Sequence, residues 1–143
     1  MDRALLNRCT CFAVRRTARA LTQMYDAALA PAGIRSTQYM ILAAIGDRTD
    51  VSVNDLADTM VMDRTTMGRN LRLLERDGLV TLNTPHEDRR RRDIALTRKG
   101  RAILEGAYPL WKHAHDSLQK AHGKEFLDQF RSMLKQVSPG VQG

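Results

Sequence analysis

The stretch that decides the fold runs from residue 63 to residue 97 and reads DRTTMGRNLRLLERDGLVTLNTPHEDRRRRDIALT. In its first half, Met67, Leu71 and Leu74 recur at helical spacing and Gly78 follows, a residue typical of helix ends. In its second half, the β-leaning pieces LVTL and DIAL flank a charged loop that contains a proline. The stretch therefore predicts a helix over 64–78, capped by Asp63, followed by a β-hairpin with a long tip.

A second short helix precedes this one. Ser52 and Asp55 have the spacing of a capping box, and the helix is expected to run from there to about Met60. An earlier helix begins at STQYMILAAI, with Ser36 as the candidate N-cap and Tyr39, Met40, Leu42, Ala43 and Ile45 as its buried positions. Two short helices, a tight turn and a basic hairpin together predict a winged helix-turn-helix over about 36–97.

Helices are also expected on both sides of this unit, over about 5–30 and about 98–137, with Thr97 as the N-cap of the helix that begins near Arg98. The apolar arc of the first covers about half of its circumference, wider than the ~100° stripe of a helix docked on one surface. We therefore expect it to bury one face in its own domain and another against a partner chain. The overall prediction is a single domain over 1–143, mainly α with a small β-hairpin wing, in which the terminal helices form a dimer.

The charge of the chain favours a nucleic acid as partner. The formal net charge is +7, and it is unevenly distributed, since residues 36–60 are acidic whereas 61–100 are strongly basic. No apolar run approaches the roughly 18 residues that span a bilayer, and the N-terminus lacks the pattern of a signal peptide. The expectation is a cytoplasmic protein without a membrane partner.

The helix over 64–78 has a face suited to the major groove. Its polar side, opposite the apolar residues, holds arginine, threonine and glycine, and the acidic Glu75 and Asp77 occur only at its far end. A merely solvated face would mix both charges along its length, whereas arginine forks onto guanine edges and glycine lets backbones approach. The predicted DNA-binding residues are Arg64, Thr65, Thr66, Gly68, Arg69 and Arg72 on the helix and Arg89, Arg90, Arg91 and Arg92 in the wing.

Residues 53–100 resemble the MarR family of bacterial transcription regulators. The resemblance lies in DRTTMGRNLRLLERDGLV and in the pattern D-x-R-x-x-x-I-x-L-T-x-x-G from Asp88 to Gly100, and the flanking helices match the family plan. It implies a homodimer whose first and last helices interlock. Such a dimer is expected to bind double-stranded DNA with a pseudo-palindromic operator through two recognition helices and two wings, as a repressor.

The same resemblance implies a signal that changes DNA affinity. Family members typically bind a small phenolic or other aromatic ligand between the dimer helices and the DNA-binding lobe, or oxidise a cysteine there. Candidate pocket residues are Arg15, Arg16 and Arg19 for a carboxylate and Tyr39 and Trp111 for a ring. Ordinary surface arginines and core aromatics are the alternative.

The N-terminal CTCFAV resembles the organic-hydroperoxide-sensing branch of the family, with Cys11 at the position that is oxidised and Tyr25 at that of one tyrosine partner. Fourteen helical residues span about 21 Å, so these two could meet only across a dimer interface. On one continuous helix Cys9 and Cys11 point about 200° apart, which excludes a disulfide between them. The alternative is that both are buried structural cysteines.

Two other classes of function are alternatives, an enzyme and a basic adaptor protein. An enzyme is disfavoured because His86, His113, His115 and His122 stand in no ligand-like or catalytic cluster, and no phosphate-binding loop is present. We expect no catalytic residue, no metal site and no cofactor. A basic adaptor that binds RNA or protein stays open as an alternative, although the stacking aromatics of single-strand readers are lacking.

Overall fold

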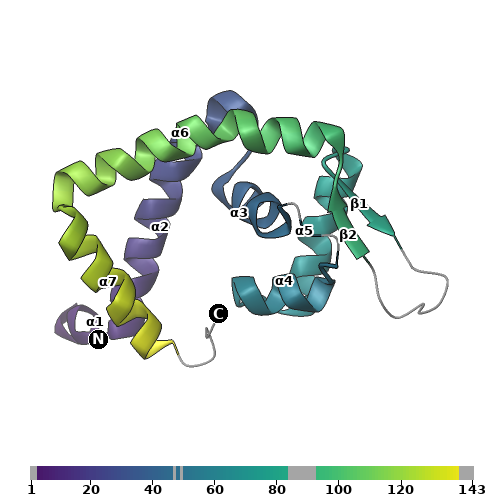
Figure 1. The fold of residues 1–143 in the computed structure, drawn as a ribbon. Helices are drawn as coiled ribbons and strands as arrows, with labels where there is room; N and C mark the ends of the chain where they lie inside the picture. Colours follow the sequence, from purple (N-terminus) through teal and green to yellow (C-terminus); the bar gives the residue numbers. More distant parts are fainter. Residues whose placement is uncertain (1–2, 47, 49, 84–92, 139–143) are drawn as a thin grey trace.

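The computed structural model describes residues 3–46, 48, 50–83 and 93–138. In order, the chain forms α1 (Arg3–Arg8), α2 (Thr10–Leu29), the 3-10 turn η1 (Ala30–Ala32), α3 (Ser36–Ile45), α4 (Val53–Met60), α5 (Arg64–Arg76), β1 (Val80–Asn83), β2 (Asp93–Leu96), α6 (Arg98–His122) and α7 (Lys124–Val137). Figure 1 shows α6 as a long arc across the molecule, with α3, α4, α5 and the hairpin gathered under one half of it and α2 and α7 under the other. The predicted fold class, a mainly α winged helix-turn-helix with a β-hairpin, is confirmed.

The core lies where α3, α4 and α5 meet the hairpin and the first half of α6. The three apolar residues that predicted α5, Met67, Leu71 and Leu74, are all buried in it. In α3 the prediction was partly wrong, because Met40 and Ala43 are exposed and Ile41 is fully buried. A short apolar run such as YMILAAI has apolar residues on every side, so its sequence alone does not decide which side faces the core.

Three of the four predicted N-caps are confirmed. Ser52 and Asp55 form a reciprocal capping box, the Asp63 carboxylate accepts from Thr66 N–H, and the Thr97 hydroxyl accepts from Gly100 N–H. Each of these bonds joins residues three apart, so the local sequence is sufficient to specify it.

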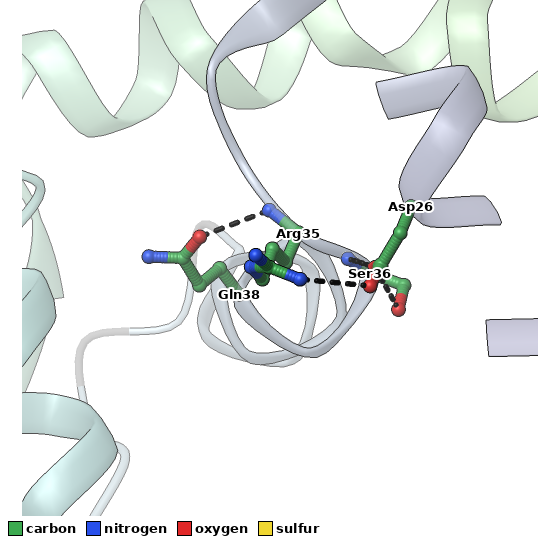
Figure 2. A network of polar contacts seen from close by, with 4 residues as sticks. All are labelled: Asp26, Arg35, Ser36 and Gln38. Atoms are coloured by element: carbon green, nitrogen blue, oxygen red, sulfur yellow. Dashed lines mark hydrogen bonds and ion pairs between the residues drawn. The ribbon is translucent and has the colours of Figure 1, made fainter. Parts of the chain in front are cut away.

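The fourth N-cap, Ser36, was predicted wrongly. The cap position is Arg35, whose side chain offers no acceptor, and Ser36 is the first helical residue. The missing acceptor comes from α2: Asp26 Oδ1 lies 2.7 Å from both the backbone nitrogen and the Oγ of Ser36, and Gln38 accepts from Arg35 N–H (Figure 2). The two hydrogen bonds from Ser36 hold the Asp26 pKa below its ordinary value, and the nearby Arg35 guanidinium adds to the effect.

The hairpin is anchored to the rest of the winged unit through Val51. β1 and β2 are antiparallel, with Val80 opposite Leu96 and Asn83 opposite Asp93. Ile94 also donates to the carbonyl of Val51, 3.1 Å away, so a residue before α4 extends the pairing beyond the hairpin. The base of the wing is therefore held rigidly against the helix-turn-helix.

The first predicted helix is interrupted. Instead of one helix over 5–30, α1 ends at Arg8, Cys9 is extended at the N-cap of α2, and η1 follows Leu29. The break at one residue leaves the apolar spacing nearly unchanged, so periodicity could not reveal it. The prediction that Cys9 and Cys11 point to opposite sides of one continuous helix is thus wrong. Both cysteines are exposed in the single chain rather than buried.

The terminal helices leave apolar surface uncovered in the single chain. Large exposed side chains include Leu6, Val14, Phe126, Met133 and Val137. No helix within the described residues is both long enough and apolar enough to cross a membrane.

Candidate nucleic-acid interface

The N-terminus of α5 is built by a local cap. Asp63 accepts from the backbone N–H of Thr66 at 2.8 Å and from its hydroxyl at 2.6 Å, and these bonds lower the pKa of the Asp63 carboxyl. The carboxylate also opposes the positive end of the helix dipole. The cap therefore fixes the first turn of α5, where Arg64 and Thr65 are exposed.

The two faces of α5 divide as the sequence predicts. Met67, Leu71 and Leu74 are buried, whereas Leu73 is exposed, and Arg64, Arg69 and Arg72 are exposed on the remaining surface. Within the described part of the chain, none of these three guanidinium groups forms an ion pair. The five N–H donors of each guanidinium group are thus available to an anionic or hydrogen-bonding partner.

Two predicted contact residues have distinct surroundings. The hydroxyl of Thr66 is engaged by Asp63, so only its remaining lone pairs and methyl group face outward. A Cβ added at Gly68 would meet only a distant guanidinium nitrogen of Arg72, at 3.9 Å. Packing inside the chain therefore does not require glycine at this position, which is compatible with close approach of an external backbone.

Sequence reasoning did not find the neighbours that restrain this surface. Asn70 donates to the carbonyl of Thr66, and Arg76, at the far end of the polar face, is held by Asp77 at 3.1 Å. The Asn70 bond spans four residues within the helix, and i,i+4 spacing could have suggested it.

The base of the wing is fastened to the end of α5. The Thr97 hydroxyl donates to the carbonyl of Gly78 at 2.6 Å, and Lys99 Nζ donates to that of Asp77 at 2.8 Å. The predicted wing residues Arg89, Arg90, Arg91 and Arg92 lie outside the described residues.

Comparison with known proteins agrees with this architecture. A model of the MarR family matches residues 32–91. The HTH-type transcriptional regulator SarZ of Staphylococcus saprophyticus is 31% identical over 100 residues, which cover 70% of this chain and 68% of SarZ. The chain belongs to the MarR family. The organic hydroperoxide resistance transcriptional regulator of Bacillus subtilis is 27% identical over 106 residues, covering 74% of this chain and 72% of that protein.

Among solved structures, the MarR-type chain is similar to the transcriptional regulator MosR of M. tuberculosis in complex with DNA. The two share 36% identity and superimpose with a TM-score of 0.81, covering 94% of this chain and 99% of MosR. The likeness extends over the terminal helices as well as the winged unit.

Two of the candidate ligand residues meet in an aromatic cluster. Trp111 of α6 stacks with Tyr39 of α3 and Tyr25 of α2, with ring centroids 6.0 and 6.4 Å apart, and with His115 at 5.1 Å. Burial raises the pKa of both tyrosine hydroxyls, so they are neutral at physiological pH. Tyr108 also stacks with Trp111, with ring centroids 6.1 Å apart.

The candidate arginines are placed differently. Arg15, Arg16 and Arg19 are exposed on α2, and the guanidinium of Arg16 lies over the ring of Phe12, 5.6 Å from its centroid. None of the three forms an ion pair within the described part of the chain. They are free to meet a carboxylate that approaches α2 from outside the chain.

The two redox candidates are apart within one chain. The Tyr25 ring stacks with Trp111, and the Tyr25 hydroxyl lies 3.4 Å from His115 Nδ1. Cys11 is fourteen residues away, near the start of the same helix. Among the described residues, no three His, Cys, Asp or Glu side chains are grouped so as to hold a metal ion.

Proposed function

We propose that this MarR-family chain is a sequence-specific transcription regulator that binds double-stranded DNA as a homodimer and represses transcription. The observation that carries the proposal is the polar face of α5. There three exposed guanidinium groups, which form no ion pair with any residue that the structure describes, lie opposite the buried Met67, Leu71 and Leu74. In this proposal Arg64, Thr65, Thr66, Gly68, Arg69 and Arg72 lie in the major groove and Arg89, Arg90, Arg91 and Arg92 contact the flanking DNA.

The proposed homodimer explains the uncovered apolar surface of the terminal helices. Phe126, Met133 and Val137 line α7 and are more than half exposed in the single chain, and Leu6 and Val14 add to this surface from α1 and α2. Apolar groups gathered on helices at the two ends of a chain favour burial against a second copy. A two-fold dimer would place two α5 helices on a pseudo-palindromic operator with half-sites about one helical turn apart.

The proposed signal is a small phenolic or aromatic ligand. The stacked rings of Tyr25, Tyr39 and Trp111 join α2, α3 and α6, so a ring inserted beside them would change how the terminal helices meet the winged unit. Arg15, Arg16 and Arg19 would bind its carboxylate from the exposed side of α2. A ligand preferring one spacing of the recognition helices would shift DNA affinity.

A thiol sensor is the second candidate. Cys11 is exposed, and the relative from Bacillus subtilis is named for organic hydroperoxide resistance. Attack of the Cys11 thiolate on a hydroperoxide would yield a sulfenic acid and an alcohol. With Cys11 and Tyr25 far apart on one helix, their partnership requires Tyr25 of the second subunit.

The DNA-binding proposal is tested with a duplex selected by the protein from a random pool. Arg69→Ala should lose about 1–3 kcal/mol of discrimination between the selected duplex and random DNA, because a bidentate contact to a base is removed. Alanine at Arg90 and Arg91 should instead weaken binding to both duplexes and flatten the salt dependence.

Filter binding with duplex DNA and with RNA of the same sequence provides the control. Preference for RNA, or selection of no duplex at all, would favour the adaptor alternative. If Arg69→Ala loses the same affinity for selected and for random DNA, the division between base-reading and phosphate-binding residues is contradicted.

A further inference from the structure

The turn between α4 and α5 contains an unusual residue. Val61 has φ 50° and ψ 46°, the left-handed conformation, and it is the one residue other than glycine with positive φ among those the structure describes. Because valine is branched at Cβ, this conformation is strained. The strain lies two residues before Asp63, the cap of the proposed recognition helix.

The hydrogen bonds around Val61 show that the turn itself does not require valine. Met62 N–H donates to the carbonyl of Ala57 at 2.8 Å and Val61 N–H to that of Asp58 at 3.2 Å, the pair that defines a Schellman motif. The left-handed position of this motif is usually glycine, which has no Cβ to clash.

The same chain builds the motif a second time with glycine. At the end of α5, Leu79 N–H donates to the carbonyl of Leu74 at 2.8 Å and Gly78 N–H to that of Glu75 at 2.9 Å. Gly78 has φ 73°. The two helix ends are thus matched in their hydrogen bonds and differ in the residue at the strained position.

Packing within the chain does not compensate the strain at Val61. Val61 is 66% exposed, whereas the neighbouring Met60 and Met62 pack against the core. The isopropyl group therefore projects from the surface beside the N-terminus of α5. An apolar, strained and exposed residue at this place is explained if its side chain is used in a complex.

We propose that Val61 is a DNA-contacting residue whose isopropyl group packs on an apolar part of a nucleotide, the thymine methyl group or the deoxyribose. The inference rests on the proposed function, because it places α5 in the major groove with its N-terminus at the bases. Val61 adds to the arginines of α5 a contact that recognises shape rather than hydrogen bonds.

The test compares wild-type protein with Val61→Gly and Val61→Asn. Both variants accept the left-handed conformation more readily, so their Tm should be equal to or above that of the wild type. Affinity for the duplex selected by the wild type should fall about tenfold, the loss expected for about two methyl groups buried per dimer, one from each Val61. A fall in affinity without a fall in Tm would exclude misfolding as its cause.

Replacing each thymine of the selected duplex in turn by deoxyuridine distinguishes the two contacts. If deoxyuridine at one position weakens binding of the wild type but not of Val61→Gly, Val61 contacts the methyl group of that thymine. If Val61→Gly binds the selected duplex more weakly and no such position exists, Val61 contacts the deoxyribose.

Val61→Gly with wild-type or higher affinity overturns the inference while the proposed function stands. Wild-type protein that selects no duplex overturns the proposed function itself, and the two failures are therefore distinguishable.

Discussion

Replacing Asp26 by alanine tests how the α2 helix is joined to the winged unit. The Asp26 carboxylate substitutes for the side-chain cap that Arg35 cannot provide, and one oxygen accepts both the N–H and the hydroxyl of Ser36 (Figure 2). The Asp26 side chain is 23% exposed and Ser36 is 6% exposed, so the two donors lose their partner in a largely buried place. We expect Asp26→Ala to destabilise the protein measurably.

The magnitude follows from the two hydrogen bonds. Loss of a helix N-cap costs about 1 kcal/mol, and loss of the hydroxyl's partner costs about 1 kcal/mol more. Water entering the vacated space limits the sum, and the ion pair to the exposed Arg35, 3.5 Å away, adds little. The expected loss is about 2 kcal/mol, or about 6–8 °C in Tm for a chain of this length.

The dependence on pH gives a second, independent measure. The pKa of Asp26 in the folded protein lies below its ordinary value of 3.8, so the carboxylate stabilises the fold at neutral pH. This contribution is complete above about pH 4 and is lost as the pH falls through the folded-state pKa. The difference in stability between wild type and Asp26→Ala should therefore be constant from pH 8 to pH 5 and shrink below about pH 4.

The assay is denaturant and thermal unfolding of both proteins at one fixed protein concentration, since the stability of the proposed dimer would depend on concentration. Asp116→Ala is the matched control, because Asp116 is an exposed carboxylate paired with Lys112 on α6, and it should change stability by no more than about 0.5 kcal/mol. Asp26→Asn keeps an acceptor and should recover part of the loss. A loss in Asp26→Ala no larger than that in Asp116→Ala, or a difference that persists unchanged at pH 3, would refute the reasoning.

Three other substitutions give clear expectations. Gly100→Ala should destabilise the fold by about 3 kcal/mol or more in chemical unfolding, because its Cβ would lie 1.9 Å from the carbonyl oxygen of Leu79. Gly106→Ala in the same helix has nothing within 4 Å of its Cβ and should stabilise by about 0.5–1 kcal/mol, so equal effects of the two would contradict the packing argument. If Cys11 is a sensor, cumene hydroperoxide should release DNA from the wild type but not from Cys11→Ser, with the sulfenic acid or its products visible by mass spectrometry. Release that is the same in Cys11→Ser would exclude the thiol mechanism.

Much of the winged unit could be predicted because its signals are local. The caps at Ser52, Asp63 and Thr97 each join residues three apart, and the buried face of α5 follows from helical spacing. The contact residues on the opposite face of α5 follow from the same periodicity. Arg64, Thr65, Arg69 and Arg72 are exposed there, whereas Thr66 and Gly68 are partly buried, and the DNA contacts of all six stay a prediction.

Local signals failed where two conformations fit the same residues equally well. Cys9 interrupts the first helix without disturbing the apolar spacing, and the apolar run of α3 faces the core on a side that its sequence does not specify. The strain at Val61 was equally hidden, because valine is not the residue expected in a left-handed turn.

The sequence by itself determined the order and type of most elements and the face of α5, since these depend on residues within about one helical turn of each other. The resemblance to the family also lies in the sequence, over residues 53–100. Only the tertiary structure decided that Asp26 caps α3 from another helix and that Val51 joins the wing. It alone also brought Tyr25 and Tyr39 onto Trp111. These contacts join residues 10 to 86 positions apart, and their partners are chosen by how the helices pack rather than by any spacing along the chain.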